Sequence, residues 1–187
     1  MSVIAELCGN HNGDKELLWR MVDSAAKAGA WACKIQSFFA DDLSTEWRHD
    51  YERMKRLELD FKTHLEFVTK CKDNGVTPMT SVYAIRYLPE LSDCGFRHIK
   101  IGSPYCTDRE LIQTYTAFGF KMFVSTGGTE LSRVPAIHPI ECVMHCVSKY
   151  PSHPDEANLS RLWEIKHRWP KSALGFSDHS TPRIYHK

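Results

Sequence analysis

Short apolar runs alternate with amphipathic stretches of helical length along the whole chain, and this alternation constrains the fold more than any other feature. Strands that alternate with helices pair in parallel and form a parallel sheet or a barrel. We expect strands at Val3–Cys8, Ala32–Phe38, Val76–Ser81, His98–Gly102, Lys121–Ser125, Ile140–His145 and Ala173–Phe176. The pattern therefore predicts an α/β fold, a (β/α)₈ barrel of the TIM type truncated to about seven strands, because a complete barrel has eight.

Helix start and stop signals lie between these runs. Asp14 is the expected N-cap of a helix from about Lys15 to Ala28, and Gly29 is its expected C-terminal stop. Further helices are expected near Asp60–Asp73, near Ile85–Cys94, after an Asp108 cap and over Leu159–Trp169. Because no low-complexity segment or linker interrupts the series, we expect a single domain over residues 1–187.

Composition excludes several classes of partner. Hydrophobic residues make up 42% of the chain and charged residues 25%, with a net charge of +1, so neither nucleic acid nor an anionic membrane is expected. No apolar stretch has the length of a membrane span, and the chain begins directly on a strand without a basic leader. The seven cysteines form no CxxC pair and fall mostly in apolar runs, which favours reduced thiols in a cytoplasmic protein.

Polar side chains recur directly after the apolar runs. They are Glu6, Lys34, Ser81, Lys100, Ser103, Ser125, Ser177 and His179. In barrel enzymes the chemistry lies at the C-terminal ends of the strands. These residues therefore predict one shared active site.

Two lysines in this set, Lys34 and Lys100, stand at matching strand ends beside serines. Fixed cations with short hydroxyl donors and neighbouring glycines are the groups that bind phosphate and carboxylate. A lysine at the end of a strand can also be merely solvated. Two lysines in matching positions favour an anion-binding site over that alternative.

Six motifs occur in a fixed order along the chain. They are AELCGNHNGD at the first strand, Lys34-Ile35-Gln36, Lys100 to Ser103 (KIGS), Ser125-Thr126-Gly127, His145 to Pro151 (HCVSKYP) and Ser177-Asp178-His179. Together they resemble the N-terminal barrel of the sialic acid synthase family, with the first glycine displaced by one position. That family condenses phosphoenolpyruvate with an N-acyl hexosamine to give a sialic-acid-like nonulosonic acid.

The resemblance implies roles for individual residues. Glu6, Lys34 and Lys100 are expected to be catalytic. The residues expected to bind phosphoenolpyruvate or the amino-sugar acceptor are Gln36, Ser81, Ser103, Ser125, Ser148, Tyr150 and Ser177. His179 resembles one of two histidines that hold a divalent metal, Mn²⁺ or Mg²⁺, the second of which comes from the eighth strand. In the family the metal polarises the sugar aldehyde, the enol carbon attacks it, water adds and phosphate leaves.

Glu6 has two compatible interpretations. A carboxylate on an otherwise apolar strand is costly unless it is paired or functional. It can position or activate the water that attacks the phosphoenolpyruvate carbon, or it can form an ion pair with Lys34 on the adjacent strand.

The acceptor half of the site departs from the family pattern. Pro104 and Tyr105 stand where the family has Gly-Glu, and Ser148 replaces an asparagine. The antifreeze-like C-terminal domain, which in the family places an arginine over a partner subunit's site, has no counterpart in this sequence. The resemblance therefore implies an acceptor that is an N-acyl hexosamine or a related sugar aldehyde, and the sequence does not identify which one.

Two other functions stay open. One is a catalytically impaired, anion-binding relic that serves as an interaction module, and the other is a barrel aldolase whose lysine forms a Schiff base. In addition, a barrel with a missing strand exposes the edges of its first and seventh strands, so we expect a homo-oligomer.

Overall fold

The computed structural model describes residues 1–43, 49–136 and 139–180, which fall into two compact units, Met1–Ile99 and Lys100–Lys187. The strands are β1 (Ile4–Glu6), β2 (Ala32–Ser37), β3 (Thr77–Val82), β4 (His98–Ile101), β5 (Lys121–Ser125), β6 (Cys142–Cys146) and β7 (Ala173–Ser177). The order of strands in the sheet follows the chain, from β1 to β7. The predicted α/β class, with about seven strands, is confirmed.

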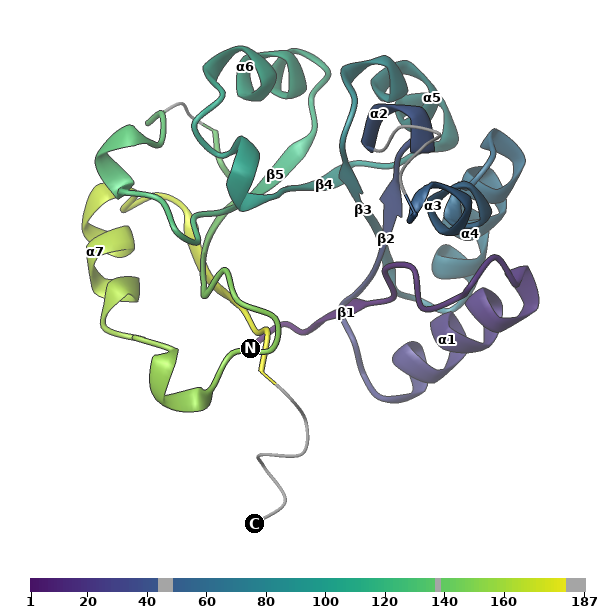
Figure 1. The fold of residues 1–187 in the computed structure, drawn as a ribbon, viewed down its shortest axis with the longest axis horizontal. Coiled ribbons are helices and arrows are strands. Elements are labelled where there is room, and N and C mark those ends of the chain that lie inside the picture. The colour runs from purple at the N-terminus through teal and green to yellow at the C-terminus, as the bar shows by residue number, and fades with distance from the viewer. Residues whose placement is uncertain (44–48, 137–138, 181–187) are drawn as a thin grey trace. The chain divides into compact units, whose positions relative to one another are not determined.

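Helices connect the strands, as Figure 1 shows. They are α1 (Lys15–Lys27), α2 (Ala40–Leu43), α3 (Tyr51–Leu57), α4 (Phe61–Asp73), α5 (Leu88–Cys94), α6 (Arg109–Ala117) and α7 (Arg161–Arg168). The 3₁₀ helices are η1 (Ile85–Tyr87), η2 (Ser103–Tyr105), η3 (Leu131–Arg133) and η4 (Pro154–Glu156). Among the described residues, no helix has the length and apolar character needed to cross a membrane.

The predicted helix caps are present. Asp14 accepts a hydrogen bond from the Leu17 N–H at 3.0 Å, and Asp108 accepts one from the Leu111 N–H at 2.9 Å. Gly29 has a φ of 81°, a left-handed conformation that glycine adopts without steric cost at a helix end. Local sequence therefore fixes where α1 and α6 begin and where α1 ends.

Several predicted boundaries were wrong. β1 is shorter than Val3–Cys8 because Cys8 has a φ of 45°, which turns the chain away from extended geometry. The helix expected at Ile85–Cys94 is divided into η1 and α5, and Pro89 lies in the first turn of α5. The polar stretch after β2 contains the short helices α2 and α3, which the prediction missed; residues 44–48 lie outside the described part.

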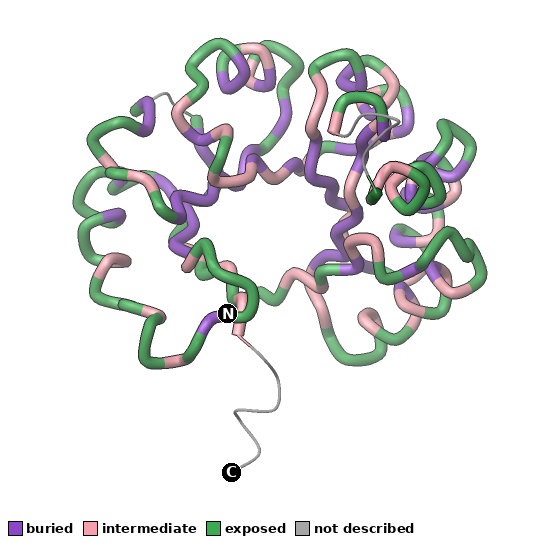
Figure 2. The backbone as a smooth tube through the Cα atoms, viewed as in Figure 1, coloured by how far each residue is buried: buried purple, intermediate pink, exposed green. Residues whose placement is uncertain are grey.

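The first unit packs its helices against parallel strands. β1 pairs with β2 and β2 with β3, and Glu6 lies level with Lys34 in this register. Leu18 and Val22 of α1 and Phe67 and Val68 of α4 are buried. Figure 2 shows the same division, with buried segments along the strands and exposed segments on the outer sides of the helices.

In the second unit β5 pairs in parallel with β6, and β6 with β7. Ile112 of α6 and Ile165 of α7 are fully buried with the strand residues Val124 and Val143. The seventh strand is less covered, since Leu174 and Phe176 keep 40% and 36% of their surface exposed. This exposure agrees with the expected uncovered edge, but association through it stays a prediction.

A buried hydrogen-bonded chain links β2, β3, α4 and α5 in the first unit. The Thr80 hydroxyl lies 2.7 Å from the Ser37 hydroxyl, which lies 2.9 Å from His64 Nε2. The opposite ring nitrogen, Nδ1, lies 3.0 Å from Glu90. Burial lowers the pKa of His64, although the hydrogen bond to Glu90 opposes this effect.

We predict that His64 makes the protein less stable as the pH falls. The folded state holds this imidazole neutral, whereas the unfolded chain binds a proton below about pH 6.5, so the free energy of unfolding falls below that pH. One such proton contributes a slope of up to about 1.4 kcal/mol per pH unit. Urea unfolding of the wild type and of His64→Gln between pH 7 and pH 5.5, where carboxylates stay ionised, should show a smaller slope in the variant. Equal slopes would contradict this account.

Candidate active site

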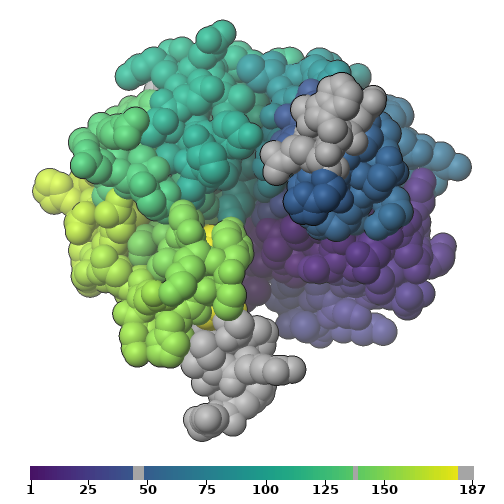
Figure 3. Space-filling view, in the orientation of Figure 1, coloured from purple at the N-terminus to yellow at the C-terminus, as the bar shows by residue number. Residues whose placement is uncertain are grey.

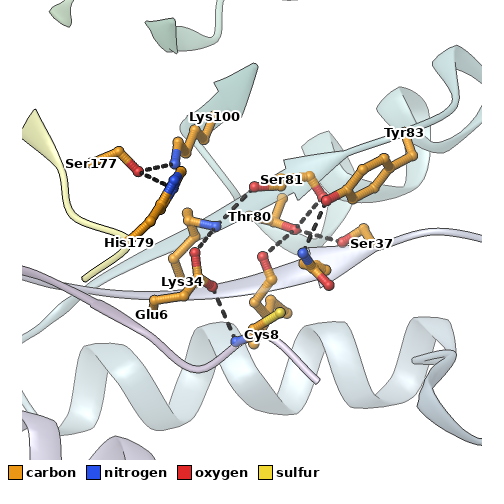
Figure 4. A network of polar contacts seen from close by, with 12 residues as sticks. Glu6, Cys8, Lys34, Ser37, Thr80, Ser81, Tyr83, Lys100, Ser177 and His179 are labelled. Carbon is orange, nitrogen blue, oxygen red and sulfur yellow. Dashed lines mark hydrogen bonds and ion pairs between the residues drawn. The ribbon is translucent and has the colours of Figure 1, made fainter. Parts of the chain in front are cut away.

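A buried lysine organises the polar residues of the first unit. Lys34 Nζ donates to Ser81 Oγ at 2.8 Å and forms a short ion pair with Glu6. Only 4% of the Lys34 side chain is exposed, against 45% for Glu6. Glu6 Oε1 also accepts a hydrogen bond from the Cys8 N–H at 3.1 Å. Figure 4 shows Glu6 and Ser81 on either side of the Lys34 ammonium.

Strand register produces this arrangement. Lys34 pairs with Glu6 on β1 and with Met79 on β3, so Ser81 lies two residues further toward the end of β3. Side chains alternate between the faces of a strand, which places Lys34 and Gln36 together and Cys33 and Ile35 on the opposite, buried face. The ion pair considered for Glu6 is therefore present, and its catalytic role stays a prediction.

Gln36 lies two residues after Lys34 on β2. Its Nε2 donates to the Tyr83 hydroxyl at 2.9 Å. Tyr83 follows β3 directly, at a position equivalent to those from which the other candidate residues were chosen, yet the sequence analysis did not select it. The sequence could have pointed to Tyr83, because its hydroxyl follows directly after the end of β3.

A second lysine–serine pair lies in the second unit. Lys100 Nζ donates to Ser177 Oγ at 2.9 Å, and Ser177 Oγ lies 3.3 Å from His179 Nε2. Figure 4 shows the Ser177 hydroxyl joined by dashed lines to both the Lys100 and the His179 side chain. The structure thus repeats the contact of Lys34 with Ser81, with one lysine and one strand-end serine in each unit.

Hydrogen bonds fix the tautomer of His179. Its Nδ1 lies 2.5 Å from the Val147 carbonyl oxygen, which can only accept, so Nδ1 carries the proton. Nε2 is then the acceptor for the Tyr150 hydroxyl at 2.8 Å, and the two rings stack with centroids 4.0 Å apart. Histidines that bind metals through Nε2 are oriented in the same way by a backbone carbonyl.

The metal site predicted at His179 lacks further protein ligands within the described residues. Among the residues that the structure describes, no group of three or more histidine, cysteine, aspartate or glutamate side chains could hold a metal ion. His179 offers one nitrogen ligand, and a single imidazole binds divalent metals weakly. The described residues therefore do not form a complete Mn²⁺ or Mg²⁺ site.

Ser103 and Ser148 line a pocket of about 390 Å³ in the second unit. Ser103 Oγ accepts a hydrogen bond from the Gly127 N–H at 2.9 Å and lies 3.3 Å from Cys146 Sγ. Ser148 is exposed, like Tyr150, and Figure 3 shows the light green segment that follows β6 at the surface. The predicted residues Ser103 and Ser148 therefore line the same pocket, whereas Tyr150 contacts His179.

Ser125 at the end of β5 is 2% exposed, and its hydroxyl is among the buried polar atoms without a hydrogen-bond partner in the described part of the chain. Buried hydroxyls are nearly always paired, so an unpaired one calls for an explanation. A ligand atom would supply the missing partner. This observation supports Ser125 as a binding residue, a role that stays a prediction.

The structure groups the candidate residues within each unit. In the first unit Glu6, Lys34 and Ser81 are in contact, and in the second Lys100, Ser177 and His179 are. Whether Lys34 and Lys100 bind the same ligand stays a prediction. Arg133 and Thr107, which the sequence analysis did not select, also line the pocket beside Ser103.

Known proteins share this chain's sequence over most of its length. It is 26% identical to the N,N'-diacetyllegionaminic acid synthase of Campylobacter jejuni over 202 residues, covering 95% of this chain and 60% of that protein. It is 28% identical over 198 residues to the N-acetylneuraminate-9-phosphate synthase of Drosophila melanogaster, covering 95% of this chain and 53% of that protein. The chain thus spans little more than half the length of these relatives.

A solved structure matches the fold. The N-acetylneuraminic acid (sialic acid) synthetase of Leptospira borgpetersenii superposes with a TM-score of 0.85 and 27% identity, over 95% of this chain and 65% of that protein. This match confirms the predicted TIM-type barrel class with about seven strands and the resemblance to sialic acid synthases. The model of the NeuB family matches residues 21–186. The chain therefore belongs to the NeuB family.

Proposed function

We propose that this chain is a synthase domain that condenses phosphoenolpyruvate with an N-acyl hexosamine or a related sugar aldehyde. The product is a nonulosonic acid of the sialic acid type. The relatives named above are legionaminic, neuraminic and sialic acid synthases, which supports an enzyme of carbohydrate biosynthesis. The observation that carries the proposal is the repeated lysine–serine pair, Lys34 with Ser81 and Lys100 with Ser177.

Phosphoenolpyruvate carries a phosphate and a carboxylate, and the two pairs offer matching chemistry. Each lysine supplies a fixed positive charge, and each serine keeps a hydroxyl beside that charge. The unpaired Ser125 hydroxyl adds a donor that a ligand can use. In the proposed reaction the enol carbon attacks the aldehyde, water adds at the phosphate-bearing carbon, and inorganic phosphate leaves.

Glu6 is the candidate for guiding that water. Its side chain is about half exposed while the carboxylate is held by the Lys34 ammonium and the Cys8 N–H. A carboxylate fixed in this way and open to solvent can orient a water molecule or accept its proton. We propose this role for Glu6, in addition to its ion pair.

A divalent metal, expected as Mn²⁺ or Mg²⁺, stays a proposal. His179 Nε2 could contribute one ligand, and the other ligands would have to come from outside the described residues. Self-association also stays a proposal, and light scattering across a concentration series tests it. A monodisperse monomer would contradict the homo-oligomer and favour a role as a non-catalytic relic.

The Schiff-base alternative is disfavoured at Lys34. A nucleophilic lysine needs a neutral amine in desolvated surroundings, whereas Lys34 Nζ is ion-paired with Glu6. Borohydride trapping with pyruvate distinguishes the two chemistries, and the proposed function predicts no adduct.

We predict that Lys34→Ala and Lys100→Ala each weaken phosphoenolpyruvate binding by about 1.5–3 kcal/mol, the range for a hydrogen bond to a charged group. Isothermal titration calorimetry, with and without Mn²⁺, measures this effect. The matched control is Lys121→Ala, which removes the same charge from the exposed start of β5. If both variants bind like the wild type, the anion site is elsewhere.

We predict that Glu6→Gln lowers turnover far more than it lowers the melting temperature. The amide keeps the shape and an oxygen acceptor for the Cys8 N–H, but it removes the carboxylate charge. Phosphate release from phosphoenolpyruvate in the presence of the acceptor reports turnover, and thermal unfolding reports stability. A large drop in melting temperature with unchanged specific activity would show that Glu6 is architectural.

A further inference from the structure

Tyr83, the residue that follows β3, holds the side chain of Gln36, one of the predicted substrate-binding residues. Gln36 Nε2 donates to the Tyr83 hydroxyl at 2.9 Å. The network of polar contacts in Figure 4 includes Tyr83 together with Lys34 and Ser81. The polar arrangement of the first unit therefore extends beyond the lysine–serine pair to a glutamine–tyrosine pair.

The contact of Gln36 with Tyr83 repeats the geometry of the contact between Lys34 and Ser81. Lys34 is level with Met79 in the register of β2 and β3, but it bonds to Ser81, two residues further along β3. Gln36 is level with Ser81, and it bonds to Tyr83, again two residues further along. Because side chains two residues apart on a strand share one face, Gln36 lies on the same face as Lys34. Its carboxamide is the next polar group after the Lys34 ammonium toward the C-terminal end of β2.

The ring of Tyr83 is supported by Phe38. The two rings meet edge to face, with centroids 6.2 Å apart and an angle of 87° between their planes. Phe38 is 2% exposed, and its carbonyl accepts a hydrogen bond from the hydroxyl of the buried Tyr87 at 3.0 Å. Packing against a buried residue therefore holds the Tyr83 ring, although Tyr83 lies beyond the end of β3.

The bond to Tyr83 determines which end of the Gln36 carboxamide is left for a ligand. A carboxamide has an NH₂ donor at one end and an oxygen acceptor at the other. Nε2 donates to Tyr83, and Gln36 makes no other hydrogen bond to the residues that the structure describes. The side chain is only partly buried. Its Oε1 atom is therefore left to accept a hydrogen bond from an N–H or O–H group of a ligand.

A glutamine without such a bond rotates about its side-chain torsions and can exchange the positions of its oxygen and nitrogen. Ordering this side chain when a ligand binds costs conformational entropy, and a side chain that is already ordered avoids the cost. A reversed carboxamide would also place its own N–H groups against a donor of the ligand. The Tyr83 hydroxyl therefore favours both the affinity for such a ligand and the choice of a ligand with a donor at this position.

We propose that Tyr83 is a positioning residue for the acceptor sugar. Its hydroxyl holds the Gln36 carboxamide so that Oε1 accepts a hydrogen bond from an N–H or O–H group of the sugar. The carboxamide is neutral and suits an uncharged sugar, whereas the Lys34 ammonium suits the anionic groups of phosphoenolpyruvate. The inference rests on the proposed function, since the acceptor is the second substrate of that reaction.

Calorimetry with N-acetylmannosamine and N-acetylglucosamine as probes tests the role of Tyr83. Tyr83→Phe keeps the ring against Phe38 and removes only the hydroxyl. It should weaken binding of the sugar by about three- to tenfold, the loss of one neutral hydrogen bond, and leave phosphoenolpyruvate affinity unchanged. In the phosphate-release assay it should raise the KM for the acceptor more than it lowers kcat.

A double-mutant cycle shows whether Tyr83 acts through Gln36. Gln36→Met keeps the length of the side chain and removes both polar atoms, so it should weaken sugar binding by itself. Adding Tyr83→Phe to Gln36→Met should then cause no further loss. An equal loss from Tyr83→Phe in both backgrounds would overturn the proposal, because Tyr83 would then act without Gln36.

Tyr115→Phe is the matched control, because it removes the same hydroxyl from a buried tyrosine of α6 in the second unit. It should bind the sugar and phosphoenolpyruvate like the wild type, and circular dichroism should show that each variant is folded. Unchanged sugar affinity in Tyr83→Phe, or a wild type that binds neither sugar, would overturn the proposal. An equal loss of phosphoenolpyruvate affinity in Tyr83→Phe would also overturn it, by showing general damage to the first unit. A wild type whose sugar binding depends on Tyr83 but that does not bind phosphoenolpyruvate would support the role of Tyr83 and reject the proposed condensation.

Discussion

The ion pair between the buried Lys34 ammonium and Glu6 is the interaction on which the candidate site of the first unit depends. An ammonium group with 4% of its side chain exposed has lost most of its hydration, which is costly unless nearby groups replace it. Glu6 and the Ser81 hydroxyl do so from β1 and β3, the strands on either side of β2. The register of the parallel strands brings Glu6, Lys34 and Ser81 together. The pairing of the strands therefore also forms the candidate site.

The second unit also places a lysine beside a serine at the end of a strand, but a histidine contacts that serine. Lys100 contacts Ser177, and Ser177 contacts the neutral Nε2 of His179, whose proton lies on Nδ1 because of the Val147 carbonyl. In the proposed reaction Lys34 and Lys100 each offer a positive charge to the ligand.

The sequence predicted the strands and helix caps well, because interactions between residues close together in the sequence determine them. Apolar runs with helical spacing between them set the α/β class, and Asp14 and Asp108 cap helices through bonds to backbone groups three residues away. The division of the helix at Pro89 and the helices α2 and α3 were missed, since they depend on turns and on packing rather than on periodicity. The contact of Lys34 with Ser81 follows from the register of β2 and β3, whereas Lys100 contacts Ser177 although β4 and β7 do not pair, so the sequence could not predict that partner. Arg133 could not be predicted, because its place in a pocket follows from tertiary bonds of Arg161 and Arg168 to the same segment.

The central proposal is that Lys34 and Lys100 are ligands of phosphoenolpyruvate. A crystal structure of this chain with phosphoenolpyruvate tests it most directly. The proposal predicts that the Nζ atom of each lysine lies about 2.7–2.9 Å from a phosphate or carboxylate oxygen of phosphoenolpyruvate, the distance of a charge-assisted hydrogen bond. A molecule bound to only one lysine, or bound away from both, would contradict the account.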